Sequence, residues 1–135
     1  MSDVALVSVK VVQQGKSASQ GQTREHRIDM DRPEAKGGEN RGPMGGETFL
    51  MAFGGCFMSN LLAAAQSRKV DLSGVTLDIT GSIQGTPSRF TAVQLKVSSD
   101  LGDQGTLKKL VTIAERGCLV ANTLKPAIDL DIVIA

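Results

Sequence analysis

The feature that most constrains this chain is a long apolar stretch from Glu47 to Ser67. Apolar side chains occupy most of its positions, at all angles around a helix rather than in a single stripe. A helix that is apolar on nearly all sides must be buried, either within its own chain or against a partner chain. At about 1.5 Å per residue, it would be about 30 Å long, which is the diameter of a small domain. We therefore expect a central helix.

Two adjacent glycines, Gly54 and Gly55, lie inside this stretch. Each glycine costs a helix about 1 kcal/mol relative to alanine. Because some gain must offset that cost, we expect another element to approach the helix backbone closely at this point. Glu47 at the start and the Arg68–Lys69 pair at the end complement the helix dipole, which supports a helix between these positions.

Alternating apolar residues on both sides of the central helix indicate β-strands. We expect strands over residues 4–12, 23–30, 75–83, 90–97 and 128–134, with loops over 13–22 and 31–46. Helical spacing predicts two shorter helices, over 103–116 and 118–125, with Gly117 as a C-terminal cap between them. The order is strand-strand-helix-strand-strand-helix-helix-strand, without a repeat or a linker. It predicts one α+β domain over residues 1–135.

The composition excludes several classes of protein. Hydrophobic residues make up 41% and charged residues 21%, as is ordinary for a soluble globular chain. The net charge of +1 and the absence of Trp and Tyr argue against nucleic-acid binding, which uses excess positive charge or exposed aromatic rings. We see neither a signal-peptide pattern nor an uninterrupted apolar run of about 18 residues. We therefore expect a cytoplasmic protein with no membrane or nucleic-acid partner.

Two cysteines are the residues best suited to carry chemistry. Cys56 lies within the expected central helix, and Cys118 opens the last short helix. A thiol at a helix N-terminus has its thiolate stabilised by free N–H groups, so position alone favours Cys118 as the more acidic thiol. Both could equally be inert core residues. A zinc site needs about four ligands, and the single histidine, His26, is far from both cysteines in sequence, so we expect no metal and no cofactor.

Two further patterns point to other functions with less support. A Ser-His-Asp hydrolase would have to use His26, and the chain has no nucleophile-elbow motif. Residues 42–45 match the Gly-x-x-Gly loop of KH-type RNA-binding modules. Such a short pattern arises easily in a glycine-rich loop, and no excess of basic residues accompanies it.

The segment from Asn40 to Cys56 resembles the first cysteine motif of the OsmC/Ohr family of thiol peroxidases. In that family, a loop of Gly, Asn and Pro and a glutamate precede an apolar run that ends in Gly or Ala and a cysteine. The segment from Ala114 to Leu124 is similar to the second cysteine motif, and the turn over residues 87–90 also fits. The resemblance covers nearly the whole chain. It implies an OsmC-like α+β fold and an intertwined homodimer, whose long central helices pack against β-sheets.

The resemblance also implies a reaction, the reduction of organic hydroperoxides in oxidative-stress defence. Cys56 would attack the peroxide as a thiolate and become a sulfenic acid, and Cys118 would condense with it to a disulfide. An external thiol or dithiol would reduce that disulfide. The helix-terminus argument favours Cys118 as the more acidic thiol, but we follow the resemblance in assigning the attack to Cys56.

The family activates its attacking cysteine with an arginine that a glutamate holds. Glu47 matches the glutamate, although nine residues place it on the opposite side of a straight helix from Cys56. No motif identifies the arginine. Arg32 and Arg41, which flank the glycine-rich loop, are the candidates that we expect to contact substrate.

Other basic residues of the N-terminal part could take the place of that arginine, namely Arg24, Arg27 and Lys16. Phe49 and Phe53 are expected to line the substrate site, although a core role is the simpler explanation for such residues. Because the arginine has no assigned position, a second hypothesis stays open. On that hypothesis, the chain is a non-enzymatic small-molecule-binding protein with the same fold.

Overall fold

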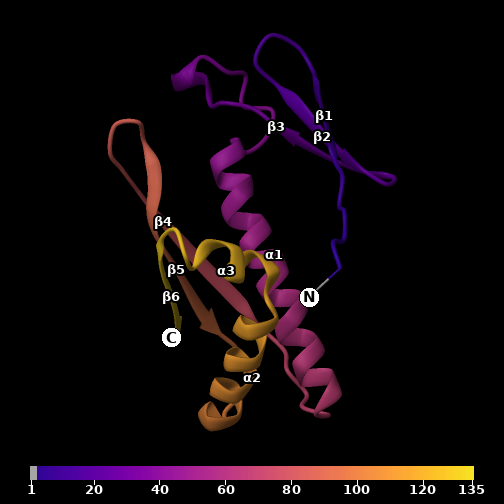
Figure 1. Cartoon of the computed structure of the whole chain (residues 1–135), viewed down its shortest axis with the longest axis vertical. Coiled ribbons are helices and arrows are strands. Elements are labelled where there is room, and N and C mark those ends of the chain that lie inside the picture. Colours follow the sequence, from indigo (N-terminus) through magenta and orange to yellow (C-terminus); the bar gives the residue numbers. More distant parts are fainter. Residues whose placement is uncertain (1–2) are drawn as a thin grey trace. The chain divides into compact units, whose positions relative to one another are not determined.

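The structure is a computed structural model that describes residues 3–135. The chain divides into two compact units, residues 1–49 and residues 50–135 (Figure 1). The expectation that residues 1–135 form one domain stays a prediction.

The first unit contains a three-stranded antiparallel sheet. Its strands are β1 (Lys10–Gln13), β2 (Ser19–Thr23) and β3 (His26–Met30), in the order β1-β2-β3. The tight turn between β2 and β3 puts Arg24 in the left-handed region, with φ of 53°. A 3-10 helix, η1 (Glu34–Lys36), lies in the loop that follows the sheet.

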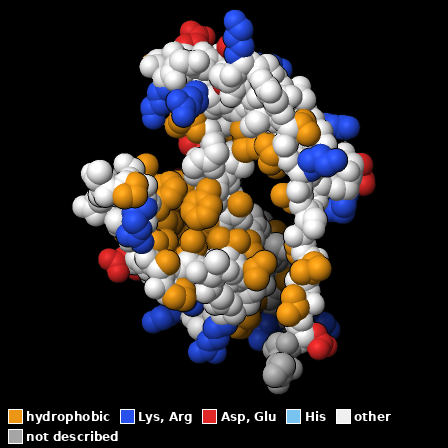
Figure 2. All heavy atoms as spheres, turned by 45° about the horizontal axis from the view of Figure 1, so that its top comes forward, with side chains coloured by type: hydrophobic (Ala, Val, Ile, Leu, Met, Phe, Trp, Pro, Cys, Tyr) orange, Lys and Arg blue, Asp and Glu red, His pale blue; other side chains and the backbone are white. Residues whose placement is uncertain are grey.

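The boundaries of these strands differ from the prediction in two places. The strand expected over residues 4–12 begins only at Lys10, because β2 ends at Thr23 and offers no partner further along. Residues 3–9 are extended and exposed, with Val4, Leu6 and Val7 each more than 80% exposed, and Figure 2 shows apolar side chains on the surface there. β2 falls in the segment predicted to be a loop, since its Ser, Gln and Thr residues show no apolar alternation.

The second unit is built on the helix α1 (Gly45–Ser67), which begins in the last residues of the first unit. A second sheet follows, with β4 (Thr76–Gln84) antiparallel to β5 (Arg89–Ser98). The helices α2 (Gln104–Gly117) and α3 (Leu119–Leu124) then connect β5 to β6 (Asp129–Ile134), which pairs with β5 in parallel. A parallel neighbour requires such a crossover connection. All these elements match the predicted ones to within about two residues.

The core of the second unit lies between α1, the sheet and the two shorter helices. The inward face of β5 alternates with its solvated face, as expected for a sheet covered on one side. The fully buried side chains that define this core are Phe53, Phe57, Leu61, Val93, Leu95, Val97, Leu107, Leu110, Ala114, Cys118 and Ala121.

The paired glycines of α1 have different surroundings. Gly54 is buried, and a Cβ there would lie 2.6 Å from Ile79 Cδ1 on β4, so the expected close approach is confirmed at this residue. Gly55 is exposed, and an added Cβ would meet nothing within 4 Å. α1 therefore needs one glycine to pack against its own sheet, while the second leaves the helix backbone bare on another side.

By length and composition, α1 could cross a membrane. An uninterrupted apolar run does not identify this helix, because Gly, Ser and Asn residues interrupt its apolar residues. Six residues of α1 are buried, and they belong to the core of the second unit or to its contact with β4. The core helix of a folded domain commonly has such a composition.

Candidate functional site

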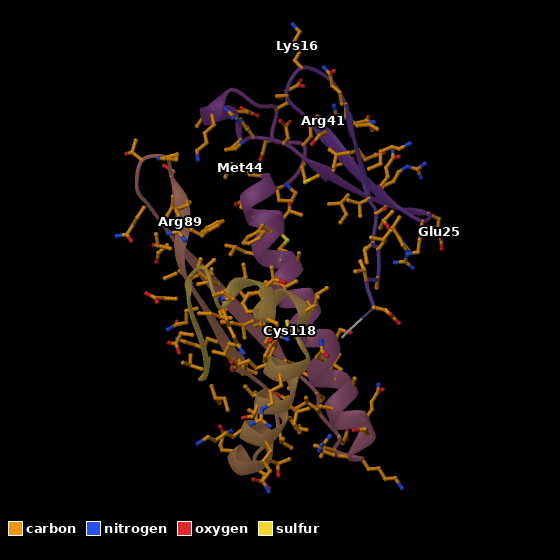
Figure 3. The ribbon with its side chains drawn as sticks, in the orientation of Figure 1. Lys16, Glu25, Arg41, Met44, Arg89 and Cys118 are labelled. Carbon is orange, nitrogen blue, oxygen red and sulfur yellow. The ribbon has the colours of Figure 1, made fainter. Side chains whose placement is uncertain are left out.

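The fold of the second unit brings the two cysteines into contact. Cys56 is half-buried in the middle of α1, and Cys118 is fully buried between α2 and α3. Both thiols are free, and the Cys118 side chain makes a hydrogen bond with that of Cys56. Figure 3 labels Cys118 at the start of α3. Two residues that lie 62 positions apart in the sequence thus form a thiol pair.

The Cys118 thiol is held in its protonated form. Burial raises its pKa, and the hydrogen bond with Cys56 acts in the same direction. The backbone N–H groups of Ala121 and Val120 favour the thiolate, but they do not offset burial. The prediction that the helix N-terminus makes the Cys118 thiol acidic is therefore wrong in direction. The helix α3 has only six residues, and desolvation of the thiol outweighs the effect of its N–H groups.

A third residue of this site is Asn60, which was not predicted from the sequence. It lies one turn after Cys56 on α1, and its Nδ2 donates a hydrogen bond of 2.9 Å to the Cys56 carbonyl oxygen. The same nitrogen is 4.0 Å from Cys56 Sγ. The four-residue spacing from Cys56 was the available signal, since residues i and i+4 share a helix face.

The predicted role of Gly117 as a helix cap is wrong. Gly117 is the last residue of α2, and Cys118 is the C-cap residue, with its N–H bonded to the Glu115 carbonyl oxygen. A Cβ at position 117 would lie 2.8 Å from Asn60 Oδ1. A glycine here leaves space for a neighbouring side chain and does not terminate the helix.

The predicted glutamate and arginines lie in the first unit. Glu47 is exposed in the first turn of α1, where its Oε1 accepts a 2.8 Å hydrogen bond from the Met44 N–H. Arg41, labelled in Figure 3, donates from its Nη1 to the Gln14 carbonyl oxygen at 2.7 Å. The Arg32 side chain is exposed. A role for these residues in activating Cys56 stays a prediction.

A buried carboxylate, Asp31, organises the loop that carries both arginines. Its oxygens accept hydrogen bonds from the backbone N–H groups of Arg32 (2.7 Å), Glu39 (3.1 Å) and Arg41 (3.3 Å). Burial works against its charge, but the Ser17 side chain and these N–H groups prevail and hold its pKa below the ordinary value. Asp31 thus fixes the backbone on both sides of residues 33–38, and sequence reasoning gave it no role.

The two phenylalanines expected in the substrate site have different surroundings. Phe53 is fully buried in the core of the second unit, whereas Phe49, in the first turns of α1, is 40% exposed. The alternative basic residues Arg24, Arg27 and Lys16 are exposed on the first unit, as is His26 at the start of β3. Within residues 3–135, no three His, Cys, Asp or Glu side chains gather as metal ligands would.

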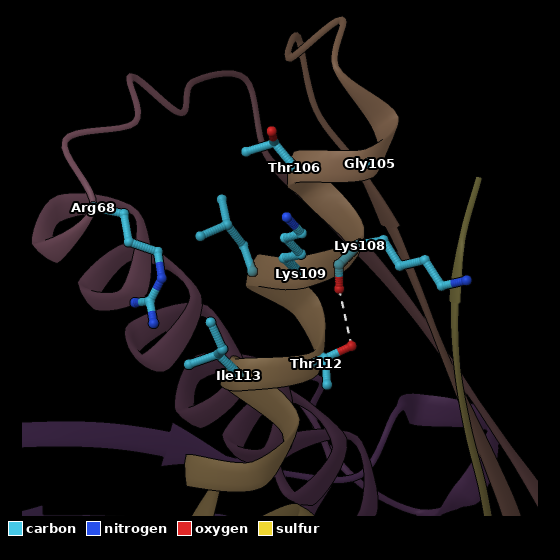
Figure 4. A pocket seen from close by; sticks show the side chains of 8 residues that line it. Arg68, Gly105, Thr106, Lys108, Lys109, Thr112 and Ile113 are labelled. Atoms are coloured by element: carbon cyan, nitrogen blue, oxygen red, sulfur yellow. Dashed lines mark hydrogen bonds between the residues drawn. The ribbon is translucent and has the colours of Figure 1, made fainter.

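A cleft of about 560 Å³ in the second unit lies apart from the thiols. It opens between Arg68, directly after α1, and residues 105–113 of α2 (Figure 4). Leu110 and Ile113 give it an apolar wall, and neither cysteine lines it. The cleft is therefore no part of the thiol site.

The structure is an α+β chain in which a thiol of the central helix contacts a thiol at the start of α3. This arrangement defines a class of two-cysteine proteins, and comparison with known sequences identifies the family. Residues 37–133 match the family model described as OsmC-like protein. The chain belongs to this family. No curated protein sequence matches the chain closely enough to count as a relative.

Solved structures confirm the fold class. A putative osmotic stress induced and detoxification response protein from Psychrobacter arcticus superposes with a TM-score of 0.84, at 18% identity over 100% of both chains. An organic hydroperoxide resistance protein OsmC from Legionella pneumophila gives 0.75, at 22% identity over 98% of this chain and 99% of the other. The organic hydroperoxide resistance protein OhrB of Bacillus subtilis gives 0.72, at 19% identity over 97% and 100%.

Proposed function

We propose that the protein is a two-cysteine peroxidase that reduces organic hydroperoxides in oxidative-stress defence. The single observation that carries this proposal is the contact between Cys56 and Cys118 in a chain of the OsmC-like family. Two of the solved structures with this fold are named organic hydroperoxide resistance proteins, which supports this choice of substrate.

The environments of the two thiols support a division of roles. Cys56 is half-buried and is the more exposed of the two, whereas Cys118 is fully buried and its raised pKa keeps it protonated. The thiolate is the nucleophile in attack on a peroxide. We therefore assign the attack to Cys56 and the second step to Cys118, which the structure already holds within hydrogen-bond reach.

The reaction balances with one external reductant. The Cys56 thiolate attacks the outer peroxide oxygen, the O–O bond breaks, and the alkoxide leaves as an alcohol after it takes a proton. The product is a sulfenic acid at Cys56. The Cys118 sulfur then attacks the Cys56 sulfur, water leaves, and a disulfide forms. An external thiol or dithiol reduces the disulfide and restores both thiols.

We further propose a homodimer in the cytoplasm, where thiols are kept reduced. Exposed apolar side chains on α1 support this assembly, since Met51 is 57% and Leu62 is 38% exposed, with Gly55 between them on the same side of the helix. In such a dimer, Glu47 and one of Arg32 and Arg41 would complete the site around Cys56. Light scattering during gel filtration tests the assembly: a mass of 14.2 kDa would exclude it, and twice that mass would support it.

Intact mass after peroxide treatment tests the reaction. Reduced protein is given one equivalent of cumene hydroperoxide, and we expect a loss of two hydrogens and a Cys56–Cys118 cross-link in the peptide map. Cys118→Ser should stop at a sulfenic acid that dimedone traps, and Cys56→Ser should leave the peroxide unconsumed. Unchanged mass with both thiols free would refute the proposal and favour a non-enzymatic small-molecule-binding protein with this fold.

A further inference from the structure

The Asn60 side chain folds back along α1 towards Cys56. A primary amide carries two N–H donors, and one of them makes the 2.9 Å bond to the Cys56 carbonyl oxygen. The same nitrogen lies 4.0 Å from Cys56 Sγ, so its second N–H is available to the sulfur. The helix itself sets this geometry, because side chains in a helix lean towards the preceding turn.

Gly117 provides the space that this amide occupies. The Gly117 backbone ends α2 without a left-handed φ, so its conformation does not require glycine. A Cβ at position 117 would nevertheless come within 2.8 Å of Asn60 Oδ1. The hydrogen bond to the Cys56 carbonyl holds the amide on one side, and the bare backbone of residue 117 accommodates it on the other.

We propose that the Asn60 carboxamide is a thiolate-stabilising donor, which bonds to the Cys56 sulfur from the space left by Gly117. A contact of 4.0 Å is long for a neutral thiol, but hydrogen bonds to ionised acceptors are shorter and about twice as strong. The bond therefore strengthens as the sulfur becomes charged. The role deepens the proposed function, on which its relevance to peroxide reduction rests.

The Asn60 amide differs from the Cys118 thiol near Cys56 in that it does not titrate. The Cys118 thiol lies against Cys56, and burial raises its pKa and favours its protonated form. Asn60 cannot titrate, so it offers the sulfur a donor at every pH. This uncharged donor supports thiolate formation from within the second unit, independently of any arginine.

The pH profile of alkylation tests this role without any peroxide. Reduced protein is treated with limiting iodoacetamide between pH 5 and pH 10, and tryptic peptides 42–68 and 117–135 report the two cysteines separately. Asn60→Leu keeps the size of the side chain and removes the donor. We expect the Cys56 profile to move up by about one pH unit, as for the loss of one charged hydrogen bond. Below both midpoints, Cys56 should react about tenfold more slowly.

Two variants separate the donor from general damage to the fold. Asn122 is exposed on α3 and donates from its Nδ2 to the Arg116 carbonyl oxygen at 3.0 Å, so Asn122→Leu is a matched control that should keep the wild-type profile. Gly117→Ala leaves Asn60 in the chain but displaces its amide, and it should shift the profile in the same direction. In an Asn60→Leu background, Gly117→Ala should add no further shift.

An Asn60→Leu profile that superimposes on the wild type would overturn the proposal. An equal shift in Asn122→Leu would also overturn it. The same holds if Gly117→Ala shifts the profile by the same amount in the wild-type and in the Asn60→Leu background. Because the assay contains no peroxide, a failed peroxidase test leaves these results meaningful. Conversely, an active peroxidase with an unshifted Asn60→Leu profile would refute the donor role alone.

Discussion

Replacing Gly54 with alanine should destabilise the protein, although alanine is the better helix former. A Cβ at position 54 would lie 2.6 Å from Ile79 Cδ1, whereas non-bonded carbon atoms settle at about 3.5–4.0 Å. The two atoms must therefore separate by about 1 Å. Overpacking of this kind costs about 1–3 kcal/mol, and helix propensity returns about 1 kcal/mol. We expect a net loss of about 1 kcal/mol in the free energy of unfolding.

A second substitution tests whether Ile79 is the cause. Ile79→Val deletes the Cδ1 atom that the new Cβ would meet, and alone it should cost about 0.5–1.5 kcal/mol. In that background Gly54→Ala meets no obstacle and should stabilise the protein by about 1 kcal/mol, so the sign of its effect reverses. The assay is urea unfolding at one fixed protein concentration, which matters if the chain is a dimer.

Additive effects would refute this reasoning. Substitutions that do not interact usually add to within about 0.5 kcal/mol. If Gly54→Ala has the same effect in the wild-type and in the Ile79→Val background, the contact between α1 and β4 does not explain why position 54 is a glycine.

Three further outcomes follow from the two units. The pKa of Cys118 in the folded state lies above its ordinary value of 9.0, so the free energy of unfolding of reduced protein should fall as the pH rises past 9.0. Urea unfolding should show a less steep fall in Cys118→Ala. The pKa of Asp31 lies below its ordinary value of 3.8, so the stability it confers holds above that pH and is lost in stronger acid; amide exchange should show Asp31→Asn opening its loop already at neutral pH. A Cβ at Gly38 would overlap the Arg32 backbone, so Gly38→Ala should make this loop sensitive to protease, while Gly45→Ala, which meets nothing within 4 Å, should not.

The second unit was predictable because its apolar residues show clear periodicity. The alternation in residues 75–83 and 90–97 and the helical spacing in residues 103–116 each identified an element of the right type. β2 carried no such signal, since its polar residues become a strand only through their partners on both sides. Residues 4–9 are the opposite case. Their β-branched residues have a high strand propensity, but they form no strand because the first unit offers them no neighbouring strand for pairing.

The candidate site was predictable only in part, for a related reason. The two cysteine motifs pointed to the thiols, but their contact depends on how the junction of α2 and α3 lies against α1, and no local pattern encodes that packing. Asn60 and Asp31 are ordinary polar residues in sequence. Each acquires a role from hydrogen bonds that exist only in the folded chain. Gly117 was assigned the commonest role of a glycine after a helix, whereas its surroundings give it another.

The position of Cys118 at the start of α3 makes the backbone sensitive to what happens at its sulfur. Sγ accepts the Ala121 N–H at 3.5 Å, in the place where most helices use a side-chain oxygen. A gain of charge or a new bond at that sulfur therefore changes the hydrogen bond that the Ala121 N–H makes. The Ala121 resonance is thus a built-in spectroscopic reporter of the thiol pair. The Thr106 amide, which Asp103 caps at 3.1 Å on α2, supplies a silent internal reference in the same spectrum.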